Sequence, residues 1–165
     1  FAGTFMLQVS TLLGFALGGW LSDRVAAHGA ARRMLAQGVA YLAAAPCLLL
    51  FLEHPGFGAM AAAVSVFSLL RGVGQANENP ALCEVVPAPF RATAVGLMNT
   101  VATAAAGVGV LLAGVLKASV GLGAIFAGIS ALFIIAGVGP IAAYFLWVRR
   151  DIERADQFLQ KLTPS

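Results

Sequence analysis

A stripe of polar residues runs through one of the apolar segments of the sequence, residues 57–79. Its members follow one another at helical offsets of three and four residues, with one adjacent pair at the end: Ser68, Arg71, Gln75, Glu78 and Asn79. Side chains at these offsets share one face of an α-helix. An arginine attracts anions and a glutamate can bind and release a proton, so the stripe is typical of a hydrated pathway for a solute or an ion.

A structural interpretation of the same residues competes with the pathway. Arg71 and Glu78 could pair inside the protein and lock neighbouring helices together. Arg71 lies about two thirds of the way along its segment, and exposure to lipid at that depth would cost several kcal/mol. Both interpretations therefore place it against protein or water. We favour the pathway, because ionisable residues inside membrane segments are usually functional.

Uncharged polar residues also occur in other apolar segments. They form pairs at helical spacing: Gln8 and Thr11, Gln37 and Tyr41, and Asn99 and Thr103. Such residues form hydrogen bonds between membrane helices more often than they bind a ligand. We nevertheless keep Gln8 and Asn99 as candidate pathway residues beside the stripe.

The composition identifies the elements that must carry these residues. Of 165 residues, 60% are hydrophobic and 10% are charged, whereas soluble domains average about 25% charged residues. A helix that crosses a bilayer needs about 20 apolar residues. The sequence therefore predicts an all-α, polytopic membrane helix bundle with five transmembrane helices, approximately 2–22, 34–52, 57–79, 92–116 and 121–147.

The positions of the cations predict the orientation of the bundle. Arginines and lysines cluster in the first and third loops and in the tail, whereas the second and fourth loops contain only Lys117. By the positive-inside rule, the cation-rich loops and the C-terminus are cytoplasmic, in a plasma membrane or a bacterial inner membrane. The tail, residues 148–165, has apolar residues at helical spacing and is expected to be an amphipathic helix at the membrane surface, rather than a docking site for a partner.

Several classes of protein are excluded or disfavoured. No basic stripe with interleaved aromatic residues indicates a nucleic-acid partner, and no phosphate-binding glycine loop indicates an ATP-driven pump. His28 and His54 are isolated, so we expect neither a metal site nor a catalytic base, and no cofactor. Cys47 and Cys83 fall on opposite sides of the membrane, and no disulfide is expected.

Small residues recur four apart in three of the segments. They are Gly14 and Gly18, then Ala36, Ala40 and Ala44, and finally Ala105, Gly109 and Ala113. Small residues at this spacing let membrane helices approach closely. The recurrence predicts a compact bundle.

Two motifs resemble those of a known family. The run Gly19-Trp20-Leu21-Ser22-Asp23-Arg24, followed by Arg32-Arg33, is similar to the signature loop of the major facilitator superfamily, although Ala26 replaces its second glycine. The run Glu84-Val85-Val86-Pro87-Ala88-Pro89-Phe90-Arg91, followed by Ala94, Gly96 and Asn99, is similar to the junction between helices ten and eleven of that family.

The resemblance implies that the five spans are helices eight to twelve of a twelve-helix transporter. The N-terminal half and helix seven would then be missing partners. Helices two to six of the N-terminal half are a less favoured assignment, because the amphipathic tail is typical of a C-terminus.

The same resemblance implies a function. Members of this family move small solutes by rocking two halves around a midplane site. We therefore expect a non-enzymatic, ion- or proton-coupled secondary transporter, with an organic anion as the favoured substrate and organic-anion or Spinster-type carriers as the most similar members. The bilayer and a small-molecule substrate are the other expected partners. A non-transporting helical adaptor and, less favoured, a membrane enzyme are the alternatives.

The signature loop also implies a cytoplasmic gate. Asp23 follows the first span, Arg91 opens the fourth, and Glu84 lies between the third and fourth, so their charges can cluster at the rim beside Gly19 and Arg24. Such a cluster would latch one state of the transport cycle. An ordinary pattern of surface charges is the alternative, and an exposed pair of that kind contributes at most about 1 kcal/mol.

Overall fold

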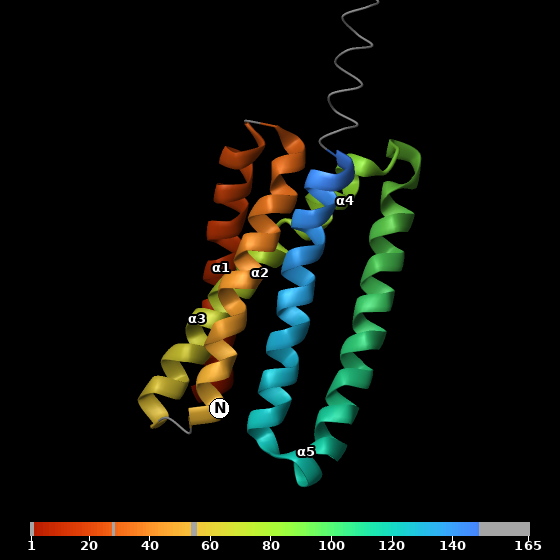
Figure 1. The fold of residues 1–165 in the computed structure, drawn as a ribbon. Coiled ribbons are helices and arrows are strands. Elements are labelled where there is room, and N and C mark those ends of the chain that lie inside the picture. The colour runs from red at the N-terminus through yellow and green to blue at the C-terminus, as the bar shows by residue number, and fades with distance from the viewer. Residues whose placement is uncertain (1, 28, 54–55, 149–165) are drawn as a thin grey trace, which may run out of the picture.

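The computed structural model describes residues 2–27, 29–53 and 56–148, and within these ranges the chain is almost entirely helical and contains no strand (Figure 1). The α-helices are α1 (Ala2–Ala26), α2 (Arg33–Leu49), α3 (Phe57–Gln75), α4 (Glu78–Val85) and α5 (Arg91–Ala143). Short helical turns follow α2 (η2, Leu50–Glu53) and precede α5 (η3, Ala88–Phe90). Four of the described helical segments are long and apolar enough to cross a membrane, which confirms the predicted fold class. Apart from Val148, the predicted tail helix lies outside the described residues.

Helix α5 folds back on itself at Gly121. Its 53 residues would extend about 80 Å if straight, more than twice the thickness of a bilayer core of about 30 Å. Gly121 has a φ of 79°, a conformation that glycine adopts without the steric penalty of a Cβ atom. The result is a proximal limb, residues 91–120, and a distal limb, residues 122–143, that run antiparallel (Figure 1). These limbs correspond to the fourth and fifth predicted spans.

Helices α1 and α3 cross with their backbones in close contact. A Cβ atom added at Gly14 would collide with the carbonyl oxygen of Leu69, and one added at Gly18 would lie 2.7 Å from the Cα atom of Val73. On α3, Gly72 faces Thr11 and Gly14 in the same way. The prediction that Gly14 and Gly18 permit close helix packing is confirmed.

Helix α2 lies between α3 and the distal limb, and it contributes most of the buried apolar side chains: Ala40, Tyr41, Ala44, Ala45 and Leu48. Its close approach to the distal limb occurs where Gly38 faces Gly137, since a Cβ atom on Gly137 would lie 2.8 Å from the Gly38 carbonyl oxygen. The contact between α2 and the distal limb also contains a buried hydrogen bond. The Ser130 hydroxyl donates it, over 2.8 Å, to the Ala45 carbonyl. The core of the described structure is therefore formed by α2, α3 and the distal limb.

The proximal limb of α5 differs from the other helices because nearly all its side chains are exposed. Ala105 and Gly109 are among them, and a Cβ atom added at Gly109 would meet nothing within 4 Å. The prediction that the small residues of this segment join a compact bundle is wrong for the part of the chain that the structure describes. Its apolar surface has no partner helix there.

Candidate functional site

The helix that carries the polar stripe breaks within the stripe. A single helix over residues 57–79 is the expectation, but α3 ends at Gln75 and α4 begins at Glu78. Pro80 explains the break, because it has no N–H group for the carbonyl of Ala76 and its ring clashes with the preceding turn. At the break, Asn77 is completely buried, and its amide donates a hydrogen bond of 2.9 Å to the carbonyl of Val73. The prediction that all five stripe residues share one face of one helix is therefore wrong.

Glu78, the first residue of α4, is half-buried and pairs with a residue of α2. Its carboxylate accepts a hydrogen bond from the hydroxyl of Tyr41. The buried Tyr41 ring packs edge-on against Phe133 of the distal limb, with 5.5 Å between ring centroids. Gly74 of α3 leaves room for this ring, since any Cβ atom there would collide with it. The Tyr41 hydroxyl thus links α2 to α4.

Arg71 lies one turn before the end of α3, and its side chain is exposed. Within residues 2–27, 29–53 and 56–148, no ion pair joins it to Glu78. Its charge is nevertheless close enough to act electrostatically on the Tyr41 hydroxyl. The structure does not show an internal Arg71–Glu78 lock in the described ranges, where Glu78 accepts its hydrogen bond from Tyr41 instead.

The remaining stripe residues separate into buried and exposed positions. Ser68 is buried, Gln75 is half-buried, and Asn79 is exposed on α4. Toward the start of α3, three apolar residues continue the side of the helix that carries Arg71 and Gln75, at offsets of three, four and seven residues. We call this side the open face of α3; it carries Phe57, Met60, Val64, Arg71 and Gln75, and the buried Ser68 lies on it between Val64 and Arg71.

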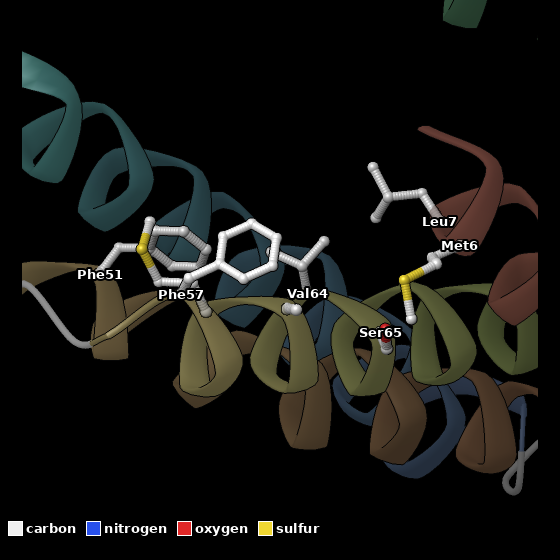
Figure 2. A pocket seen from close by; sticks show the side chains of 8 residues that line it. Met6, Leu7, Phe51, Phe57, Val64 and Ser65 are labelled. Atoms are coloured by element: carbon white, nitrogen blue, oxygen red, sulfur yellow. The ribbon is translucent and has the colours of Figure 1, made fainter. Parts of the chain in front are cut away.

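An apolar pocket of about 350 Å³ lies at the beginning of the open face (Figure 2). Phe57, Met60 and Val64 line it together with their α3 neighbours Ala61 and Ser65. Phe51 of η2 and the α1 residues Met6 and Leu7 complete its wall. Sequence reasoning missed this pocket, because each of its apolar residues is ordinary in a membrane span.

The other candidate pathway residues lie on different helices. Gln8 is exposed on α1, and Asn99 is exposed on the proximal limb. Asn99 and Thr103 line a shallow hollow of about 500 Å³ on that limb. Neither Gln8 nor Asn99 makes a hydrogen bond to the stripe in the part of the chain that the structure describes, so the structure does not bring them together with Arg71.

The proposed gate residues lie at one end of the bundle, with the first loop, α4, the start of α5 and the end of the distal limb (Figure 1). Asp23 forms an ion pair of 3.5 Å with Arg33, and 83% of its side chain is exposed. Arg91 instead donates a hydrogen bond of 3.2 Å from its Nε to the carbonyl of Val86. The structure therefore shows no direct contact between Asp23 and Arg91. Arg33 is the first residue of α2, and it is the residue that pairs with Asp23.

Arg24 and Gly19, two further gate residues, lie near the end of α1. The Arg24 guanidinium lies 3.8 Å from the centroid of the Trp20 ring, a cation–π contact. A Cβ atom added at Gly19 would meet nothing within 4 Å. Glu84 lies in α4, and its side chain is outside the described part of the structure.

Metal-ligating side chains do not gather in the described ranges. No three or more His, Cys, Asp or Glu residues are close enough there to hold one ion. Cys47 and Cys83 are both free thiols.

Comparison with known proteins identifies one family. A family model described as Major Facilitator Superfamily matches residues 1–163. The match extends over both motifs and all the described helices. No curated protein and no solved structure matches the chain with significance.

Proposed function

The chain belongs to the major facilitator superfamily, whose members are membrane transporters and not enzymes, and from this premise we propose that it moves a small organic anion across the membrane by alternating access. The five spans would be helices eight to twelve, a proposal supported by the two motifs in the first loop and before α5. The open face of α3 would then look toward the cavity that the missing N-terminal half completes. In this proposal the membrane is a plasma or bacterial inner membrane, and the rim that carries Asp23 is cytoplasmic.

The exposed guanidinium of Arg71 is the observation that carries the proposal. A charge within a membrane span requires water, protein or a counter-ion. Within the described residues no ion pair joins Arg71 to Glu78, whose carboxylate accepts a hydrogen bond from the Tyr41 hydroxyl. An anion that enters the cavity would therefore find a cation, with the amide of Gln75 one turn away on the same face.

We assign ion coupling to Glu78 in this proposal. The carboxylate is half-buried and accepts its hydrogen bond from an uncharged hydroxyl. Such a group can take up a proton without breaking an ion pair. Arg71 and Glu78 would thus divide the work, with Arg71 attracting the anionic substrate and Glu78 carrying the proton.

Uptake by the full-length protein in proteoliposomes tests the proposal. With a panel of radiolabelled organic carboxylates and phosphates, Arg71→Ala should weaken the affinity for transported anions by about ten- to a hundredfold, the value of a charge-assisted hydrogen bond of about 1.5–3 kcal/mol. Lys117→Ala removes one positive charge from the exposed proximal limb and should leave uptake unchanged, so it controls for net charge.

Three results would contradict the proposal. Unchanged anion affinity in folded Arg71→Ala protein would remove Arg71 from the binding site. Uptake that is independent of pH in the unaltered protein would refute proton coupling through Glu78. Absence of uptake for every solute tested would favour the alternative of a non-transporting helical adaptor.

A further inference from the structure

A groove of about 390 Å³ lies between α1, α2 and α3, near the end of the bundle that carries the first loop. Leu21 of α1 lies on one wall, Val39 of α2 on the other, and Val73 of α3 at the floor. Val39 is 59% exposed and Leu21 is 38% exposed, whereas Val73 is 9% exposed. The groove therefore opens away from α3, on the outside of three helices that are long and apolar enough to cross a membrane. Apart from Arg32, every residue that lines it is apolar.

The length of the groove matches the hydrocarbon of one leaflet. Its lining begins at Arg32, just before α2, and follows α2 as far as Ala43. The difference in residue number, at 1.5 Å for each residue, corresponds to roughly 16 Å along the helix axis. Half of a bilayer core of about 30 Å is about 15 Å. An acyl chain that lies along α2 in this groove would therefore extend from the headgroup level to the middle of the membrane.

Arg32 places a positive charge at the loop end of the groove. Its side chain is exposed, and in the described ranges it forms no ion pair, since the carboxylate of Asp23 pairs with Arg33. Residues 23–33 contain three arginines and one aspartate, so the surroundings of Arg32 also have an excess of positive charge. Each cation beside the end of a membrane helix attracts anionic lipids by about 1 kcal/mol. The charge and the apolar walls together complement an anionic phospholipid.

We propose that this groove binds an anionic phospholipid, with one acyl chain between α1 and α2 and the phosphate beside Arg32. The lipid is a bound partner of the bundle and not a transported solute, so the inference goes beyond the proposed function. It takes from that proposal only the orientation that puts the first loop at the cytoplasmic leaflet, whose surface is negatively charged by anionic lipids.

Two lipids with identical chains and different headgroups test the inference. Radiolabelled dioleoyl phosphatidylglycerol, which is anionic, and dioleoyl phosphatidylcholine, which has no net charge, are added to the purified full-length protein in detergent. The contact with Arg32 should make phosphatidylglycerol bind about fivefold more tightly, the equivalent of about 1 kcal/mol. Equal affinities for the two lipids would overturn the inference.

Substitutions of Arg32 identify the source of this preference. Arg32→Gln should remove the preference, whereas Arg32→Lys keeps the positive charge and should retain it. Lys117→Gln removes a cation from the exposed proximal limb, outside the groove, and should change nothing. A preference that survives Arg32→Gln would assign the effect to other cations and would contradict the site.

A matched pair of alanine substitutions tests the groove itself. Ala43 lines the groove and is exposed, whereas Ala62 of α3 is exposed and does not line it. Because both side chains are exposed, a larger residue at either position should leave the protein folded, as thermal unfolding in detergent will show. Ala43→Trp should occupy the place of the acyl chain and weaken both lipids several-fold, and Ala62→Trp should weaken neither. If Ala43→Trp has no effect, the chain does not lie in the groove and the inference is wrong.

Competition with a soluble anion separates a lipid from a free phosphate. Glycerol 3-phosphate has the phosphate without acyl chains, and in large excess it should not displace radiolabelled phosphatidylglycerol. This measurement uses the unaltered protein, so it does not depend on the folding of any variant. Displacement would refute the lipid as the occupant. Arg71 does not line the groove, so Arg71→Ala should leave lipid binding unchanged, and the inference and the proposed function can fail independently.

Discussion

The buried and the exposed residues of α3 have different surroundings. Gly72 faces α1, Gly74 faces the ring of Tyr41, and Ser68 is buried. By contrast, Arg71 is exposed and Phe57 is 87% exposed. The buried residues and Arg71 alternate along the last two turns of the helix, so α3 is packed against its neighbours close to the position where Arg71 stays exposed. Each set of residues predicts its own response to substitution.

The largest effect is expected at the crossing of α1 and α3. Gly14→Val would drive a side chain into the backbone carbonyl of Leu69, which belongs to a helix and cannot move aside. We expect a loss of about 3 kcal/mol or failure to fold, since overpacking of a close contact typically costs about 1–3 kcal/mol. Thermal unfolding in detergent measures the loss.

Gly109→Val on the proximal limb is the matched control, because nothing lies within 4 Å of a Cβ atom there. It should unfold at the same temperature as the unaltered protein. Equal unfolding temperatures for Gly14→Val and the unaltered protein would show that the helices do not cross at Gly14.

A smaller effect is expected at the hydrogen bond between α2 and α4. Tyr41→Phe keeps the ring against Phe133 but removes the hydroxyl that donates to Glu78. The half-buried carboxylate then lacks this partner, at a cost of about 1–3 kcal/mol. Because the proposal assigns the anion to Arg71 and not to this pair, anion affinity should not change.

The double variant Tyr41→Phe/Glu78→Leu tests this assignment. Replacing both partners by apolar groups should recover much of the stability lost in Tyr41→Phe. If Tyr41→Phe instead weakens anion binding at full stability, this pair contributes to the anion site, and the proposed division of roles between Arg71 and Glu78 is wrong.

The rim pair extends the comparison to a charged contact in an exposed position. Asp23→Arg breaks the contact with Arg33, but Asp23 is 83% exposed, so the loss of stability should stay below about 1 kcal/mol. If the pair latches one state of the cycle, a bias of that size should reduce the transport rate by up to about fivefold. Uptake rates at saturating substrate provide the measurement.

The swapped variant Asp23→Arg/Arg33→Asp restores the opposite charges and should recover most of the rate. Arg91→Asp combined with Asp23→Arg should not, because Arg91 bonds to the carbonyl of Val86. Normal transport by Asp23→Arg alone would refute the latch.

The smallest effect is expected on the open face itself. Gln75→Leu should change the free energy of unfolding by less than about 0.5 kcal/mol, as is usual for a position outside a packed contact. Ser68→Leu, two turns earlier on the same helix, should cost about 1–3 kcal/mol because Ser68 is 3% exposed and its site is already filled. Equal losses in the two variants would contradict the difference in burial between the two positions.

Several features of the site could be predicted because they depend on neighbours in the chain. Gly14 and Gly18 indicate a close helix crossing, and the structure has one. Arg71 was identified as a candidate from its depth in an apolar segment. The break before Glu78 was missed, although Pro80 was visible in the sequence and is sufficient to interrupt the helix.

The partner of Glu78 could not be predicted in the same way. Tyr41 lies 37 residues away in the sequence, and it competes with Arg71 and with other polar residues for the same carboxylate. The choice depends on how α2 and α4 are rotated and on the space that Gly74 leaves for the ring. Neither quantity is a property of a single helix.

The sequence by itself determined that this chain is a helical membrane bundle. Backbone N–H and C=O groups in lipid must form hydrogen bonds within each span, and the length of each apolar run identifies the spans. It also determined which residues carry charge inside those spans. Only the tertiary structure decided that Tyr41 holds Glu78, that Arg33 holds Asp23, and that an apolar pocket lies at the start of α3. The physical reason is that helices in lipid pack through close shape matching and a few hydrogen bonds, and several rotations of the same helices satisfy a sequence pattern equally well.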